Sequence, residues 1–199
     1  MALDRMTRIT LNDGHTIPPL GLGVFQIEDA TVCERVAAAL DCGYRHIDTA
    51  AIYGNEEAVG RAISRSGIPR EELFVTTKCW VDDFGREATR KAFDASRKKL
   101  GLDVIDLYLL HWPVDETMMG AWEALADLRA EGAVRSIGVS NFTVRRFEEF
   151  FLPSHGCRAG GEPGGAASVQ QPAGCAGVLS RKRHRSGKLL AAGAGEGAG

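Results

Sequence analysis

Residues 104–113 read Val-Ile-Asp-Leu-Tyr-Leu-Leu-His-Trp-Pro, and this stretch points most directly to the fold. Val104 to Leu110 are almost all apolar, which predicts a short strand buried in the protein interior. A titratable residue, His111, follows as soon as the apolar run stops. Short buried strands of this kind are typical of a parallel sheet covered by helices, so the segment favours an α/β fold.

The same pattern repeats outward from this stretch through the first 151 residues. Apolar runs predict further strands at residues 20–24, 44–47, 73–77 and 134–139. Apolar residues spaced three or four apart predict helices around residues 32–40, 56–64, 86–100, 118–131 and 143–150. Residues 9–17, with a turn at 12–14, predict a small β-hairpin. A (β/α)8 barrel needs eight strand–helix units and a doubly wound sheet can close with five, so periodicity leaves both architectures open.

Composition is that of an ordinary globular chain: 199 residues, 44% hydrophobic and 25% charged. No apolar run approaches the ~20 residues of a membrane span, and residues 1–5 lack the apolar core of a secretory signal. The five cysteines are odd in number and lack CxxC spacing, so we expect neither a disulfide framework nor a metal site. We therefore expect a cytoplasmic protein with no membrane partner.

The last 48 residues differ in kind from the rest of the chain. Six Lys or Arg and two Glu give residues 152–199 a net charge of +4, while the remaining 18 basic and 24 acidic residues give −6. This segment holds half of the 24 glycines, and its apolar residues show no helix or strand periodicity, which predicts a disordered tail. Its basic cluster, residues 181–185, is typical of a solvated charge run; the alternative is a nucleic-acid-binding module, and we expect no nucleic-acid partner.

Polar residues follow the predicted strands repeatedly. They are Asp48 and then Tyr53, Lys78, His111, and the pair Ser140–Asn141. In a barrel the carboxyl ends of the strands form the active-site face, so these residues are the candidates for chemistry. Gly21 and Gly23 do not form a phosphate loop, because the third glycine of that motif is absent.

Five segments in unbroken order resemble the aldo-keto reductases. They are Gly-Tyr-Arg-His-Ile-Asp-Thr-Ala at 43–50, Tyr-Gly-Asn-Glu at 53–56, Thr-Thr-Lys at 76–78, Leu-Leu-His-Trp-Pro at 109–113 and Ile-Gly-Val-Ser-Asn-Phe at 137–142. The resemblance implies a (β/α)8 TIM barrel, of which residues 1–151 supply about five units after an amino-terminal hairpin. It also implies reduction of a small aldehyde or ketone to an alcohol, with NADPH as the cofactor.

The resemblance further implies roles for individual residues. Tyr53 is the expected proton donor, since a carbonyl oxygen that gains negative charge needs a proton. The Lys78 ammonium is expected to favour the phenolate, and Asp48 to hold Lys78 by an ion pair. His111 is expected to orient the carbonyl oxygen. Ser140 and Asn141 are expected to bind the nicotinamide carboxamide.

Three aromatic residues complete the expected site. By the same resemblance Phe25, Trp80 and Trp112 form the apolar wall of the substrate pocket. The alternative is that they belong to the ordinary hydrophobic core. Substrate identity, the choice between NADPH and NADH, and the oligomeric state are left open by the sequence.

The resemblance ends near Phe151, where three further units are expected. A segment Val-Asn-Gln-Val-Glu-Leu-His-Pro is missing, yet one choice of codons for residues 161–168 spells it when read one base later. Our hypothesis is that residues 152–199 are the family's gene read out of frame, which sequencing the coding DNA tests. This leaves a second functional interpretation, an inactive fragment that lacks the cofactor's phosphate site.

Overall fold

A computed structural model of the chain describes residues 7–114 and 116–151. Five strands form one parallel sheet in the order β3-β4-β5-β6-β7: Leu22–Gly23, His46–Asp48, Phe74–Cys79, Ile105–Leu110 and Val134–Val139. β1 (Ile9–Thr10) and β2 (Thr16–Ile17) pair antiparallel as the predicted hairpin. The predicted tail, with residues 161–168 and the basic cluster at 181–185, lies outside the described residues.

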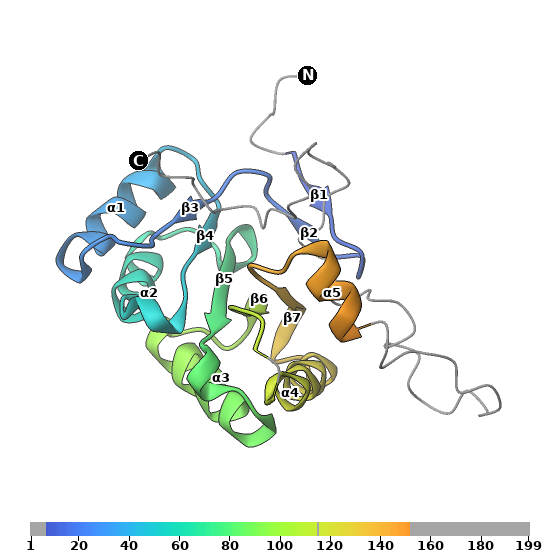
Figure 1. Cartoon of the computed structure of the whole chain (residues 1–199). Helices are drawn as coiled ribbons and strands as arrows, with labels where there is room; N and C mark the ends of the chain where they lie inside the picture. The colour runs from blue at the N-terminus through green and yellow to red at the C-terminus, as the bar shows by residue number, and fades with distance from the viewer. Residues whose placement is uncertain (1–6, 115, 152–199) are drawn as a thin grey trace, which may run out of the picture.

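A helix follows each strand of the sheet. These are α1 (Asp29–Asp41), α2 (Glu56–Arg65), α3 (Arg86–Leu100), α4 (Met118–Ala130) and α5 (Val144–Phe151). Consecutive helices from α1 to α4 pack against one another along the outer side of the curved sheet (Figure 1). Strand order equal to chain order, with a helical crossover each time, confirms the expected five α/β units.

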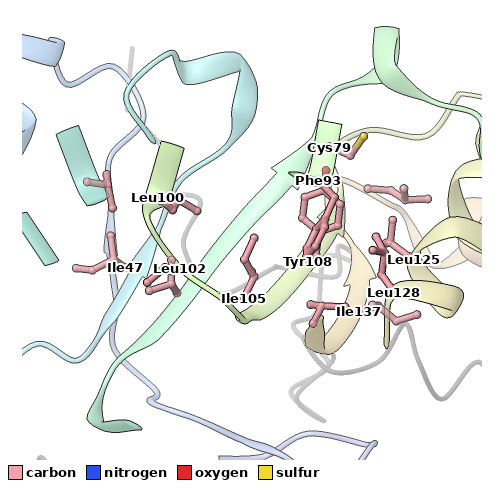
Figure 2. Close-up of a cluster of buried hydrophobic side chains, with 14 of the residues drawn as sticks. Ile47, Cys79, Phe93, Leu100, Leu102, Ile105, Tyr108, Leu125, Leu128 and Ile137 are labelled. Carbon is pink, nitrogen blue, oxygen red and sulfur yellow. The ribbon is translucent and has the colours of Figure 1, made fainter. Parts of the chain in front are cut away.

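The main core lies between the sheet and its outer helices. Tyr108 of β6 points into this layer, where it lies with Phe93 of α3 and Leu125 of α4 (Figure 2). Leu110 of β6 belongs to the same cluster. Leu107 and Leu109 alternate to the opposite face and pack with Phe74 and the hairpin residues Leu11 and Ile17. β6 is therefore buried on both faces, as its almost entirely apolar sequence predicts.

Three strand boundaries differ from the predictions, and the first two matter for the candidate site. Asp48 is the last residue of β4 rather than the residue after it. Lys78 lies inside β5, because pairing of Cys79 with Leu110 of β6 extends that strand to Cys79. β3 is shorter than the predicted strand at 20–24, since only Leu22 and Gly23 pair with β4.

Gly21 makes room for a buried histidine. A Cβ at this position would clash with Nδ1 of His46, so only glycine leaves space for the imidazole. His46 Nε2 lies 3.0 Å from Oγ1 of Thr76, and the ring packs edge-on against Phe74. Burial and the charges of Lys78 and Arg8 lower the pKa of His46 to about 4.

This shifted pKa makes stability depend on pH. Below about pH 6.5 the unfolded chain binds a proton at His46. The folded chain does not bind that proton until the pH falls to about 4. We expect this one residue to lower the free energy of unfolding by up to about 3 kcal/mol as the pH falls across that window. Urea unfolding at pH 7 and pH 4.5 should show a smaller pH difference for His46→Gln than for the unaltered chain. Equal differences would contradict the assignment.

Candidate active site

Four of the predicted residues converge at the carboxyl ends of neighbouring strands. Asp48 ends β4, Lys78 lies near the end of β5, and His111 directly follows β6. Tyr53 ends the 3-10 turn η1 (Ala51–Tyr53), which leads from β4 towards α2. Because β4, β5 and β6 are adjacent and parallel, residues 63 positions apart in the chain meet at one edge of the sheet.

Asp48 and Lys78 form a buried ion pair. The Lys78 Nζ donates to Oδ1 of Asp48 at 2.5 Å and to the backbone carbonyl of Thr49 at 3.0 Å. Their side chains are 13% and 5% exposed, so the attraction is little screened by water. Burial raises the pKa of the Asp48 carboxyl above its usual value, and the Lys78 ammonium opposes that rise.

Tyr53 lies beside this pair. The Lys78 Nζ is 5.3 Å from the centroid of the phenol ring, whose other neighbours are Phe25 at 5.0 Å and His111 at 5.6 Å between ring centroids. Burial and the Asp48 carboxylate raise the pKa of Tyr53 to about 12. This direction is opposite to the effect expected of an ammonium neighbour. The phenol is therefore held protonated at neutral pH.

His111 is a buried neutral imidazole. Burial and the nearby Lys78 lower its pKa to about 4. The ring stands edge-on to Trp80, with centroids 5.2 Å apart. Its Nδ1 atom is buried and has no hydrogen-bond partner among the described residues.

Ser140 and Asn141 follow β7, next to His111. The Asn141 Nδ2 donates to the backbone carbonyl of His111 at 2.9 Å and lies 3.2 Å from Oγ of Ser140. Asn141 has a φ of 62°, a left-handed conformation that asparagine tolerates better than most residues. The amide oxygen of Asn141 and the Ser140 hydroxyl thus stand beside His111, where polar groups could bind a primary amide.

The three predicted aromatic residues are not part of the closed core. Phe25 is 62% exposed and Trp112 is 47% exposed, although both are large and apolar. Phe25 packs on Tyr53 and Trp80 on His111, so these two rings flank the polar groups. Trp112 is placed beside the site by its position next to His111 in the chain. Exposed aromatic side chains around buried polar groups are typical of a ligand pocket.

The sequence does not predict a role for two further residues of the site. Thr49 and Asn55 are buried, and the Thr49 hydroxyl donates to Oδ1 of Asn55 at 2.8 Å. In the sequence, Asn55 stands directly before a predicted helix, and this position indicates only a helix-capping role.

No cluster of three His, Cys, Asp or Glu side chains suited to a metal occurs in the described part of the chain. No helix within it is long and apolar enough to cross a membrane.

The ion pair yields a test of how the site is held together. Asp48→Asn keeps the shape of the side chain but leaves the buried Lys78 ammonium without its carboxylate. We expect the free energy of unfolding to fall by about 3–5 kcal/mol, the usual result of orphaning one member of a buried pair. Urea unfolding at pH 7 measures it, with Asp82→Asn, an exposed carboxylate, as the control. Equal stabilities of the two variants would contradict the energetic importance of the pair.

Comparison with known proteins agrees with this geometry. A family model described as the aldo/keto reductase family matches residues 19–159. An aldo-keto reductase of Mycolicibacterium smegmatis is 57% identical over 137 residues, which are 68% of this chain and 50% of the relative. The 9,11-endoperoxide prostaglandin H2 reductase of Trypanosoma cruzi is 50% identical over 144 residues, 72% of this chain and 51% of that protein.

Solved structures show the same fold. An aldo/keto reductase from Brucella melitensis superposes with a TM-score of 0.72 and 52% identity, over 75% of this chain and 59% of that one. A Bombyx mori aldo-keto reductase in complex with NADP gives a TM-score of 0.68 and 42% identity, over 72% and 53% of the two chains. Of the two architectures that periodicity leaves open, these matches confirm the (β/α)8 barrel rather than the doubly wound sheet.

The chain spans about half the length of the curated relatives that it matches. The family model nevertheless covers well over half of this chain. The chain belongs to the aldo/keto reductase family.

Proposed function

We propose that this chain carries the reducing centre of an NADPH-dependent oxidoreductase that converts aldehydes or ketones to alcohols. The observation that supports it best is the buried Asp48–Lys78 pair placed beside a protonated phenol and a neutral imidazole. A carbonyl that accepts a hydride at carbon needs a proton at oxygen. Tyr53 is the proton donor in this proposal, and the carbonyl compound is a small molecule.

Tyr53 suits the role of a donor because its proton is retained until a stronger base arrives. Its pKa of about 12 keeps the phenol intact at neutral pH. An oxygen that is becoming an alkoxide is more basic than a phenolate and can take that proton. When the proton leaves, the negative charge appears on the phenol oxygen of a ring whose centroid lies 5.3 Å from the Lys78 ammonium, and that positive charge stabilises it. A proton from solvent restores the phenol.

His111 orients the carbonyl group. At neutral pH the imidazole is uncharged, so it donates one N–H and does not itself act as a strong acid. Trp80 and Tyr53 pack against its ring, which fixes its direction. A hydrogen bond from His111 to the carbonyl oxygen would place that oxygen near the Tyr53 hydroxyl.

The residues after β7 fit a nicotinamide cofactor. A carboxamide presents one acceptor and two donors, and the Ser140 hydroxyl and Asn141 amide oxygen offer complementary groups beside His111. When bound, NADPH supplies the hydride that the carbonyl carbon accepts. Phe25, Trp80 and Trp112 would exclude water from the reacting atoms and contact the apolar part of the substrate.

A second proposal is that the 199-residue chain is inactive by itself. It is favoured by the observation that the chain spans about half of its relatives, so cofactor contacts made by the other half are not supplied by residues 7–151. In this case the same residues perform the same chemistry only when the rest of the barrel is present.

Substitution of Tyr53 tests the two proposals together. We expect Tyr53→Phe to lower turnover of an aromatic aldehyde at least 100-fold, because the donated proton is lost. NADPH absorbance measures the rate, and Tyr44→Phe, at a half-exposed tyrosine on another segment, is the matched control.

The outcomes separate the alternatives. Turnover by the 199-residue chain that Tyr53→Phe removes supports the first proposal. No turnover here, with Tyr53-dependent turnover after joining residues 1–151 to the carboxy-terminal half of the Mycolicibacterium relative, supports the second. Turnover that survives Tyr53→Phe in both chains contradicts the role of Tyr53.

A further inference from the structure

We infer that Asn55 is a positioning residue that ties the loop carrying Tyr53 to the strand ends carrying Asp48 and Phe25. The consequence for catalysis rests on the proposed function, whereas the structural coupling does not. Asn55 follows η1 and stands directly before α2, two residues beyond Tyr53.

Both polar atoms of the Asn55 side chain are used across the site. Oδ1 accepts a hydrogen bond from Oγ1 of Thr49 at 2.8 Å, and Nδ2 donates to the backbone carbonyl of Val24 at 3.0 Å. Asn55 is 1% exposed and Thr49 is fully buried, so neither bond competes with bulk water. A single planar amide therefore connects the end of β3, the end of β4 and the start of α2.

The helix-capping explanation for this asparagine does not hold. Asn55 occupies the N-cap position of α2, where asparagine usually accepts a hydrogen bond from the first helical turn. Its side chain makes no such bond. The amide is turned away from the helix and towards Thr49 and Val24 instead, which assigns it to the strand ends rather than to helix stability.

Thr49 extends the connection to Lys78. Its hydroxyl bonds to Asn55, its backbone carbonyl accepts from Nζ of Lys78 at 3.0 Å, and its backbone N–H donates to the carbonyl of Thr76 at 2.9 Å. Every polar group of Thr49 is thus engaged. A displacement of the Thr49 side chain changes the position of the carbonyl that holds the ammonium.

Val24 extends the connection to the aromatic side of the site. Its backbone N–H donates to the carbonyl of Asp48 at 3.0 Å, while its own carbonyl accepts from Asn55. The next residue, Phe25, packs on the Tyr53 ring. Asn55 therefore sets the distance between Tyr53 and both of its neighbours, the ion pair and the Phe25 ring.

The ionisation of Tyr53 reports on this coupling without any need for turnover. The chain has three tyrosines, so tyrosine labelled with 13C at Cζ gives three NMR signals, and Tyr53→Phe identifies the one from residue 53. We expect Asn55→Ala and Thr49→Val each to lower the pKa of Tyr53 from about 12 towards the ordinary value of 10, because the freed loop admits water and withdraws from Asp48.

Two control variants separate positioning from general loosening. Ser66→Ala removes two hydrogen bonds at the opposite end of α2, to Ile63 and from Ile68, and should leave the pKa of Tyr53 unchanged. Thr49→Ser keeps the hydroxyl and should restore the value that Thr49→Val loses. The double variant Asn55→Ala/Thr49→Val should shift the pKa by less than the sum of the single shifts, because both remove the same bond.

The inference is overturned by either of two results. One is an unchanged Tyr53 pKa in Thr49→Val, which is nearly isosteric and so preserves packing. The other is an equal fall in Ser66→Ala, which would show that any loosening of α2 has the same effect. Turnover measured in parallel tests the proposed function separately, since an inactive chain can still show the expected pKa shifts.

Discussion

The buried Asp48–Lys78 ion pair is the interaction on which the rest of the site depends. Two charges that are almost completely removed from water are costly unless each has a close partner and further hydrogen bonds. The carbonyl of Thr49 supplies one of these bonds to the ammonium. Parallel pairing of β4 with β5 brings Asp48 and Lys78 together. The electrostatics of the site therefore depend on the register of these two strands.

Burial, reinforced by the charges of the pair, keeps both neighbouring side chains uncharged. The charge of Lys78 helps to keep His111 neutral, and the charge of Asp48 helps to keep Tyr53 protonated. Burial acts in the same direction on both, because it disfavours an imidazolium and a phenolate alike. A phenol that keeps its proton and an imidazole that stays uncharged therefore arise from burial together with the charges of the neighbouring ion pair.

Much of this arrangement could be predicted from sequence, and the part that could not has a physical reason. The apolar run before His111 predicts β6, and polar residues at strand ends predict which side chains meet, because parallel strands in chain order share one edge. The direction of the Tyr53 pKa was not predictable, since it depends on how deeply the phenol is buried and on how close it lies to the Asp48 carboxylate. The role of Asn55 was not predictable because its position before α2 indicates a helix cap. The direction of its amide, towards Thr49 and Val24, depends on contacts that form only in the folded structure.

The location of the core explains how the candidate site is held within the described half of the family's fold. The larger apolar cluster fills the layer between the sheet and the outer helices, whereas the smaller one under the hairpin has five residues. Strand positions are thus fixed mainly from the outside, by packing of Tyr108, Phe93 and their neighbours rather than by the barrel interior. Among the described strands β3 and β7 each have one paired neighbour, yet Asp48, Lys78 and His111 belong to β4, β5 and the end of β6, which are paired on both sides. Three of the four groups proposed for chemistry therefore stand on the part of the sheet that is paired on both sides.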